Sequence, residues 1–159
     1  MRRAPRAPAR VYSCAMAAWG MFVLGGCQEE LPNATPEGAV RELAEHLRQL
    51  DGSNAEAEKA FALLSIETKE NLQLRAERYS AASGKHIAPH RMIAPASFRE
   101  SFYGQRYESE ISGTQALVRV RGLVETDEAV VRCVYEDGGW RVHVPLPPLP
   151  GVVVRPRNQ

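Results

Sequence analysis

The stretch ALVRVRGLVETDEAVVRCVYEDGGWRVHV, residues 116–144, decides the fold class. Apolar residues alternate with charged ones in 116–121 and again in 140–144, and this period of two predicts strands with one buried face. The run 129–135 is apolar except for Arg132. Such a run predicts a central strand that is covered on both faces.

A further strand is predicted before this stretch, because charged residues alternate with apolar or small ones in 106–111. Turn-forming residues separate the four runs, at 112–113, 125–128 and 137–139. The second half of the chain therefore predicts a four-stranded antiparallel meander.

Three helices are predicted before the sheet. Thr35-Pro36-Glu37 begins the first, because threonine is a good cap, proline is tolerated at the first helical position and glutamate faces the positive end of the helix dipole. Ser53 opens a capping box for the second helix. The third runs from Ile66 to about Ser83, and Gly84 ends it. Its predicted apolar face consists of Leu72, Ala76, Tyr79 and Ala82.

Helices followed by a meander predict an α+β domain over residues 35–147, in which three N-terminal helices pack on one face of a curved four-stranded antiparallel sheet. Residues 85–97 contain two prolines and predict a crossing loop between the two halves. Residues 148–159 are predicted to form a proline-rich, extended tail.

The first 26 residues have the layout of a secretory signal peptide. Residues 1–10 contain four arginines and no acid, and residues 11–26 carry no charge. The apolar run has 16 residues, fewer than the roughly 20 that span a bilayer as a helix. An uncleaved anchor helix and an ordinary signal peptide that ends near a chance cysteine are the alternatives.

The end of this segment, Leu24-Gly25-Gly26-Cys27, resembles the lipobox of bacterial lipoproteins. The resemblance implies cleavage before Cys27 and acylation of that cysteine, so that the chain is held on a membrane by lipid. Residues 27–34 would then form the lipidated cysteine and a short tether. In bacterial lipoproteins, an aspartate directly after the cysteine resembles a signal for retention in the inner membrane. This chain has Gln28 there, so we expect the outer membrane, with the domain in the periplasm.

Composition limits the partners of the mature chain. Residues 27–159 contain 16 basic and 19 acidic residues, a formal charge of −3, and this balance argues against a nucleic acid. Cys133 is the one cysteine left after Cys27 is acylated, so no internal disulfide is predicted, and its apolar neighbours predict a buried, inert thiol.

The order of elements resembles the cone-shaped, nuclear-transport-factor-two-like fold found in small bacterial lipoproteins. The phrase EDGGWRVHVPLP, residues 136–147, carries the strongest likeness, and LLSIETKENLQLRAERYSAASG, residues 63–84, with MIAPASF, residues 92–98, adds to it. The resemblance implies a pocket between sheet and helices. It does not imply an activity, because this fold hosts enzymes, binding proteins and scaffolds.

Two sets of residues are candidates for a site. The first is a pocket with Tyr103, Tyr107 and His143, where an isomerase or hydratase would place an acid or a base. The second is an arginine-bearing sheet face that would bind an anion or a partner. Its members are Arg119, Arg121, Arg132 and Arg141.

Each candidate set has a plainer explanation. His143 alternates with Arg141 and would then be solvated, and Tyr107 would fill the core. If Glu110 lies opposite Arg119, then the arginine face carries cross-strand ion pairs.

Metal and cofactor sites are not predicted. His86 and His90 have the spacing of helical ligands, but Pro89 lies between them and no third ligand is near in the sequence. No glycine-rich phosphate loop is found, and no nucleophile or paired-acid motif.

The sequence leaves enzyme activity open but favours a membrane-anchored, non-enzymatic binding or accessory module of the cell envelope. Its partners would be the membrane, through acylated Cys27, and an envelope protein or a small ligand. The alternatives are an isomerase- or hydratase-like enzyme that uses the pocket, and a passive structural lipoprotein that is a monomer or a homodimer formed through the sheet.

The lipobox gives a direct test. Chain expressed in a bacterial host and extracted with detergent should lack residues 1–26 and carry acyl mass, whereas a Cys27→Ser variant should carry none. Intact mass spectrometry measures both. Wild-type chain that keeps residues 1–26 and has no acyl group would contradict the prediction.

Overall fold

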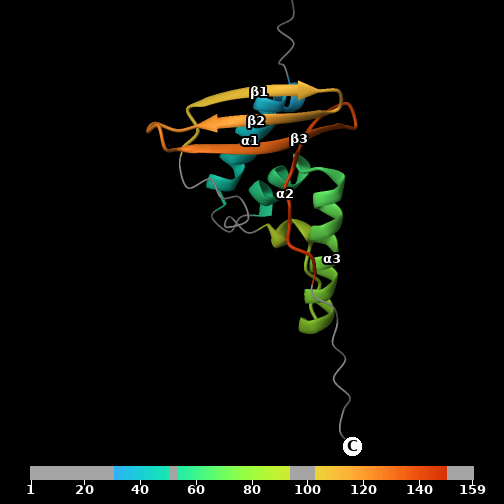
Figure 1. The fold of residues 1–159 in the computed structure, drawn as a ribbon. Coiled ribbons are helices and arrows are strands. Elements are labelled where there is room, and N and C mark those ends of the chain that lie inside the picture. Colours follow the sequence, from blue (N-terminus) through green and yellow to red (C-terminus); the bar gives the residue numbers. More distant parts are fainter. Residues whose placement is uncertain (1–30, 51–53, 94–102, 150–159) are drawn as a thin grey trace, which may run out of the picture.

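The computed structural model describes residues 31–50, 54–93 and 103–149. Its helices and strands follow the predicted order, and the protein is an α+β fold with an antiparallel sheet (Figure 1). The helices are α1 (Pro36–Arg48), α2 (Asn54–Ala62) and α3 (Ile66–Ser83), with short 3₁₀ turns η1 (Pro32–Ala34) and η2 (Pro89–Met92). The strands are β1 (Arg106–Ser112), β2 (Gln115–Arg121), β3 (Glu128–Glu136) and β4 (Gly139–His143).

The predicted starts of α1 and α3 and the predicted end of α3 are confirmed. The side-chain oxygen of Thr35 accepts the N–H of Gly38 at 3.1 Å, and that of Ser65 accepts the N–H of Thr68 at 3.3 Å. Each bond satisfies a backbone donor that lacks a partner within the first turn of a helix. α3 ends at Gly84, whose φ of 68° lies in the left-handed region that glycine adopts without strain.

The four strands pair in the order β1-β2-β3-β4. The β1–β2 hairpin closes in a two-residue turn, Gly113-Thr114, and this turn sets Glu108 opposite Arg119. The predicted pairing of Glu110 with Arg119 is therefore wrong by two residues. Because the error is even, every side chain remains on the predicted face of the sheet.

The helices pack unequally against the sheet. α1 crosses behind it in Figure 1, and we call the face towards α1 the inner face and the opposite one the outer face. α2 and α3 lie beside the β4 edge. There Leu64, between these two helices, forms a parallel bridge with Val142 of β4. The other edge of the sheet is β1.

β3 has a strand on each side, but the prediction that both of its faces are covered is wrong. On the inner face Cys133 is fully buried, whereas on the outer face Val130 is 59% exposed. Within the described residues, the helices cover one face of this strand, so the apolar run does not mark burial on both sides.

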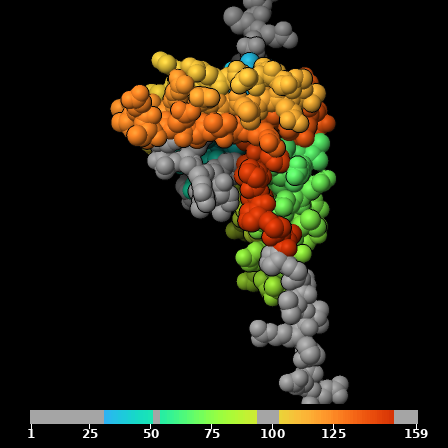
Figure 2. Space-filling view, in the orientation of Figure 1, coloured from blue at the N-terminus to red at the C-terminus, as the bar shows by residue number. Residues whose placement is uncertain are grey.

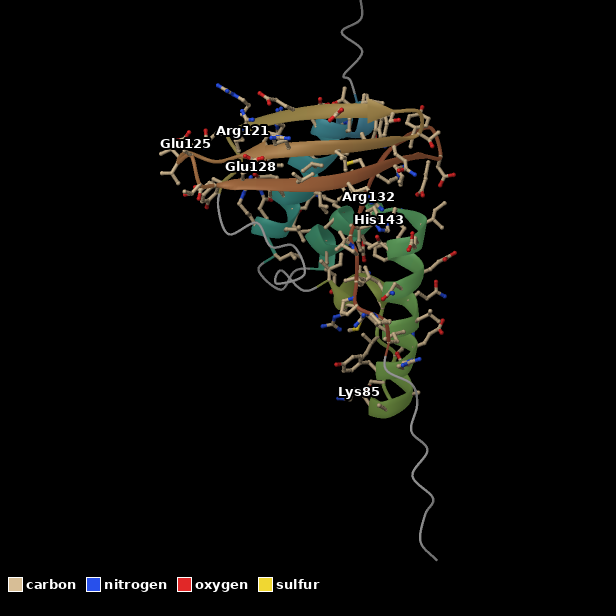
Figure 3. The ribbon with its side chains drawn as sticks, viewed as in Figure 1. Lys85, Arg121, Glu125, Glu128, Arg132 and His143 are labelled. Atoms are coloured by element: carbon tan, nitrogen blue, oxygen red, sulfur yellow. The ribbon has the colours of Figure 1, made fainter. Side chains whose placement is uncertain are left out.

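The predicted apolar face of α3 is correct for its first part. Leu72 and Ala76 are buried, but Tyr79 and Ala82 are exposed. The last turns of this helix extend past the core, and Lys85, just beyond its end, lies far from the sheet (Figure 3).

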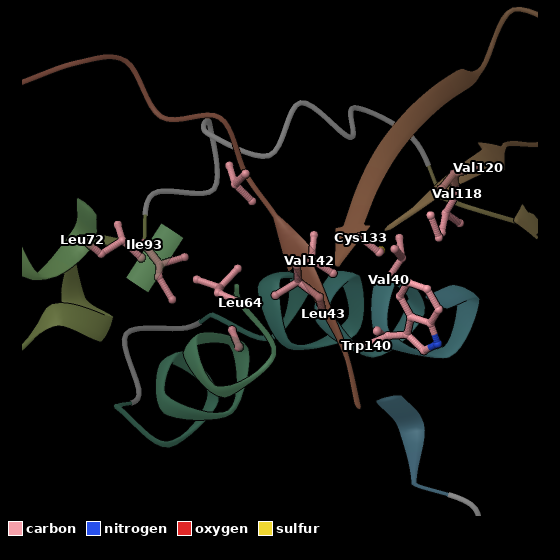
Figure 4. Close-up of a cluster of buried hydrophobic side chains, with 14 residues drawn as sticks. Val40, Leu43, Leu64, Leu72, Ile93, Val118, Val120, Cys133, Trp140 and Val142 are labelled. Carbon is pink, nitrogen blue, oxygen red and sulfur yellow. The ribbon is translucent and has the colours of Figure 1, made fainter. Parts of the chain in front are cut away.

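A continuous apolar core joins the helices to the inner face of the sheet (Figure 4). Val118 and Val120 of β2, Val142 of β4 and Leu64 are completely buried. Trp140 lies at one end of the core, where its ring meets that of Tyr135 edge-on at 5.4 Å. Full burial of such side chains contributes roughly 1.5–3 kcal/mol each.

The chain leaves β4 along α3, as Figure 2 shows. Leu146 packs against the core, and the guanidinium of Arg75 donates to the carbonyl oxygen of Pro147. At the other end of the domain, η1 packs on β4, and a side chain at Gly139 would clash with Asn33. The last residues of the predicted tether are thus a packed turn.

Several predictions fall outside the described residues. These are the signal peptide and Cys27, the first part of the tether, the capping box at Ser53, the end of the crossing loop and the tail from residue 150. None of the helices in the described ranges has both the length and the hydropathy that a membrane span needs.

Leu64 should be a critical core residue, since it is fully buried where the helices meet β4. Leu64→Ala is expected to lower the free energy of unfolding by about 2–5 kcal/mol through lost burial and a cavity. Leu74→Ala is the matched control, because Leu74 is 51% exposed and its removal should change stability by about 0.5 kcal/mol or less. Urea unfolding of a chain that lacks residues 1–26 and carries Cys27→Ser measures both, and equal losses would contradict the prediction.

Candidate functional site

The outer face of the sheet carries all four arginines of the predicted arginine face. The strand registers alternate these residues with buried ones, so they point away from α1. Two of them have acidic partners. Arg119 lies 3.1 Å from a carboxylate oxygen of Glu128, and Arg121 lies 3.8 Å from one of Glu108.

These ion pairs argue against a continuous anion-binding face. Exposed pairs of this kind contribute about 0–1 kcal/mol each, so they hold little of the fold together. They do neutralise the end of the sheet where β2 leads into β3. Arg121 and Glu128 mark this end in Figure 3. The predicted face therefore divides into a neutralised part and a remainder that holds Arg132 and Arg141.

Arg132 occupies the middle of the outer face. It lies opposite Leu117 on β2 and opposite His143 on β4. Along β3 its neighbours on the same face are Val130 and Val134. Leu117 is 47% exposed and Val130 59% exposed, so apolar side chains lie on three sides of Arg132 and His143 lies on the fourth.

Arg141 lies beside Val134, towards the β3–β4 turn. Its guanidinium donates to the carbonyl oxygen of Trp140 at 3.2 Å. Its positive charge also lowers the pKa of Lys69, although burial of the Lys69 ammonium is the larger cause. Arg141 thus bonds a backbone group of its own strand and lies near Lys69 of α3.

The predicted pocket does not assemble. Tyr107 faces the helices, opposite buried Val120, and the guanidinium of Arg41 lies 5.0 Å from the centre of its ring. Tyr103 is 68% exposed just before β1. His143 is on β4, at the opposite side of the sheet, and points to the outer face. The three side chains therefore cannot act on one substrate.

His143 contacts the start of α3 instead. Its Nδ1 lies 3.4 Å from the hydroxyl of Ser65 and 3.6 Å from a carboxylate oxygen of Glu67. Serine, histidine and an acid are the residue types of a hydrolase triad, but that mechanism needs the serine and the acid on different ring nitrogens. Here both approach the same nitrogen, and the Ser65 hydroxyl is buried as the cap of α3. The cluster is structural.

Cys133 is buried and inert, as the sequence predicts. Its thiol lies on the inner face, 3.9 Å from the carbonyl oxygen of Pro36. Burial, and to a smaller extent the negative charge of Glu37, raises the pKa of this thiol to about 12. The thiolate that a nucleophile requires is therefore almost absent near neutral pH.

A polar cluster between α1 and α2 was not predicted from the sequence. His46 lies between two carboxylates: its Nδ1 is 2.6 Å from Glu56 and its Nε2 is 3.2 Å from Glu42. Lys59 also binds Glu56, at 2.7 Å. The spacing of Glu42 and His46 along one helix was visible in the sequence, but the contact across the loop to Glu56 was not.

His86 and His90 do not form a metal-binding group with other described residues. His90 lies in η2 and His86 is exposed in the loop before it. Among the described residues, no three histidine, cysteine, aspartate or glutamate side chains lie close enough together to hold an ion.

Comparisons of this chain with protein-family models, with curated proteins and with solved structures found no match. The geometry of the chain itself therefore carries the functional argument.

The state of Cys133 can be measured directly. In a chain without residues 1–26 and with Cys27→Ser, the single thiol should not react with a disulfide reagent at pH 8, because it is buried and protonated. In denaturant it should react at the rate of a free cysteine, whose pKa is about 8.5. Rapid reaction of the native chain would contradict this.

Glu56 should make stability depend on acid. Its hydrogen bonds to Lys59 and then to His46 lower the pKa of this carboxyl from 4.5 in the folded chain. A lowered folded-state pKa contributes stability above about pH 4.5, which is lost as pH falls through the lower, folded value. Glu56→Gln should therefore destabilise the chain at pH 7 and do so less at low pH.

Urea unfolding at several pH values measures the effect. Glu70→Gln is the control, because Glu70 is an exposed carboxylate of α3. A Glu56→Gln loss that stays constant from pH 7 to pH 3 would show that its pairing does not contribute.

Proposed function

We propose that this protein is a lipid-anchored binding module of the bacterial cell envelope, which recognises its partner with the outer face of its sheet. The proposal combines an anchor, inferred from Leu24-Gly25-Gly26-Cys27, with a binding face, inferred from the structure. We place the chain at the outer membrane, with the domain in the periplasm.

The short tether supports a role close to the membrane. Four residues separate Cys27 from the packed turn η1, and an extended chain of that length spans roughly 15 Å. Acyl chains on Cys27 would provide a durable attachment, since each buried methylene contributes about 0.8 kcal/mol. The domain would then search for partners near the bilayer.

The observation that carries the binding role is the open outer face. Leu117 and Val130 are about half exposed there, and two ion pairs lie beside them towards the β2–β3 turn. An apolar centre with a polar rim is the general layout of a protein interface. The face belongs to a sheet whose interior strands are fixed by hydrogen bonds on both sides, so it is organised before a partner binds.

The enzyme alternative has no such support. Its candidate residues Tyr107 and His143 lie on opposite faces of the sheet, and the histidine contacts a helix cap. The likeness to the cone-shaped fold remains a proposal that rests on the order of three helices and a meander. It adds no catalytic residue to the argument.

Site-specific crosslinking tests the binding face. A photo-reactive amino acid at position 117 of the full chain should give an adduct with a distinct envelope protein in the native host. The same group at position 74 should not, although Leu74 is about equally exposed on α3. The adduct should be lost in Cys27→Ser if anchoring brings the two proteins together.

Each result has a clear meaning. An adduct at twice the mass of the chain would indicate a homodimer through the sheet in place of a separate partner. No adduct, or the same adducts from positions 117 and 74, would contradict the outer face as a binding surface.

A further inference from the structure

We infer that Arg132 is the recognition centre of the outer face, and that it binds a glutamate or aspartate carried between apolar residues of a partner protein. The inference rests on the proposed binding face and adds the chemistry of the partner. Of the four arginines in the predicted arginine face, it assigns recognition to Arg132 alone.

The backbone holds Arg132 in a fixed place. β3 is an interior strand, and residue 132 pairs with Leu117 on one side and with His143 on the other. Strand residues with neighbours on both sides do not move independently of the sheet. The base of the Arg132 side chain therefore starts from a defined position, so no backbone entropy is lost there on binding.

The surroundings of Arg132 strengthen its attraction to an anion when a partner binds. Leu117, Val130 and Val134 lie around it on the same face, and the first two remain about half exposed. When a partner covers these side chains, water leaves the guanidinium and its attraction to an anion increases. Arginines at the centre of an apolar patch are the typical hot spots of protein interfaces.

Three glutamates of the outer face are engaged elsewhere, and Glu67 of α3 is held 3.6 Å from His143, the neighbour of Arg132 on β4. Glu128 pairs with Arg119, and Glu108 pairs with Arg121. Glu136 accepts the first N–H of α3, from Ile66, at 2.8 Å.

Glu110 lies in the row of Arg132 but two strands away, which corresponds to about 10 Å. Within the described residues, Arg132 therefore has no ion pair. A buried, unpaired guanidinium would be costly in an interface. The partner must supply the negative charge.

A carboxylate is the anion that unmodified protein side chains can bring to this site. It can accept two parallel hydrogen bonds from one guanidinium. Leu117, Val130 and Val134 beside Arg132 favour apolar residues next to the acid of the partner. A segment with a single Glu or Asp between apolar residues satisfies both conditions.

Coupling with a carbodiimide tests this chemistry directly. Arg132→Lys keeps the positive charge and places a primary amine at the site. The carbodiimide adds to a carboxyl oxygen of the partner, and the lysine amine then attacks the activated carbonyl carbon. An amide forms, and the reagent leaves as a urea that carries the carboxyl oxygen. A new crosslink from position 132 to a Glu or Asp of another envelope protein, flanked by apolar residues, is the expected result.

Arg91→Lys is the matched control, because Arg91 is an exposed arginine of η2, away from the sheet. Wild-type chain gives the background from Lys59, Lys69 and Lys85. Circular dichroism of both variants checks that they fold. The full acylated chain is used in each case.

Binding measurements on the captured partner complete the test. Arg132→Ala should weaken the complex roughly tenfold or more, as removal of a hot spot does. Replacement of the crosslinked acid by its amide should weaken it similarly, and the two changes together should cost little more than either one. Arg91→Ala should leave the affinity unchanged.

Other outcomes overturn the inference. A crosslink from position 132 to Glu110 of a second copy would make the chain its own partner. If position 117 yields an adduct with a distinct protein but position 132 couples to no carboxylate, the binding face stands and the acidic partner is wrong. If neither position yields one, the proposed function fails as well.

Discussion

Two backbone hydrogen bonds join the helical half of the chain to the sheet, and the rest of the fold depends on them. The N–H of Ser65 donates to the carbonyl of Val142, and the N–H of Val142 donates to the carbonyl of Leu63, both at 2.9 Å. These bonds satisfy the backbone N–H and carbonyl of Val142 at the edge of β4, and they fix where α3 begins. Thr68 extends the junction, since its hydroxyl bonds both the N–H and the carbonyl of Val144. Because Ser65, Thr68, Val142 and Val144 are buried, the loss of one of these bonds would leave an unsatisfied partner away from water.

The parts of the fold that could be predicted from the sequence are those that depend on a few neighbouring residues. Caps such as Thr35 and Ser65 act within one turn of helix, so a few neighbouring residues are enough to identify them. The alternation in β2 and β4 is equally local. By contrast, the register of β1 depends on where the turn is centred. The predicted pairing of Glu110 with Arg119 centres it between Thr114 and Gln115, whereas the structure centres it between Gly113 and Thr114.

The exposed face of β3 could not be predicted for a similar reason. A run of apolar residues predicts that both faces of a strand are buried, but burial depends on which elements reach each face, and the run does not show this. Val130 and Cys133 have comparable apolar character, yet one is exposed and the other is fully buried. Arg132 was the exception within this run, and the structure gives it a central position. The contact of Glu56 with His46 likewise depends on a tertiary approach that no local pattern encodes.

The unequal edges of the sheet have a consequence for solubility. Leu64 closes the β4 edge, so β1 is the edge along which a second sheet could add and start aggregation. Its exposed outer side chains include Glu108 and Glu110. If two β1 strands met antiparallel about Ser109, Glu108 of each would face Glu110 of the other, and a shift by one pair in either direction would set one of these glutamates against itself. Like charges directly opposite each other therefore disfavour the register about Ser109, in which all seven residues of both strands would pair, and edge-to-edge growth of the sheet is opposed where it would be most extensive.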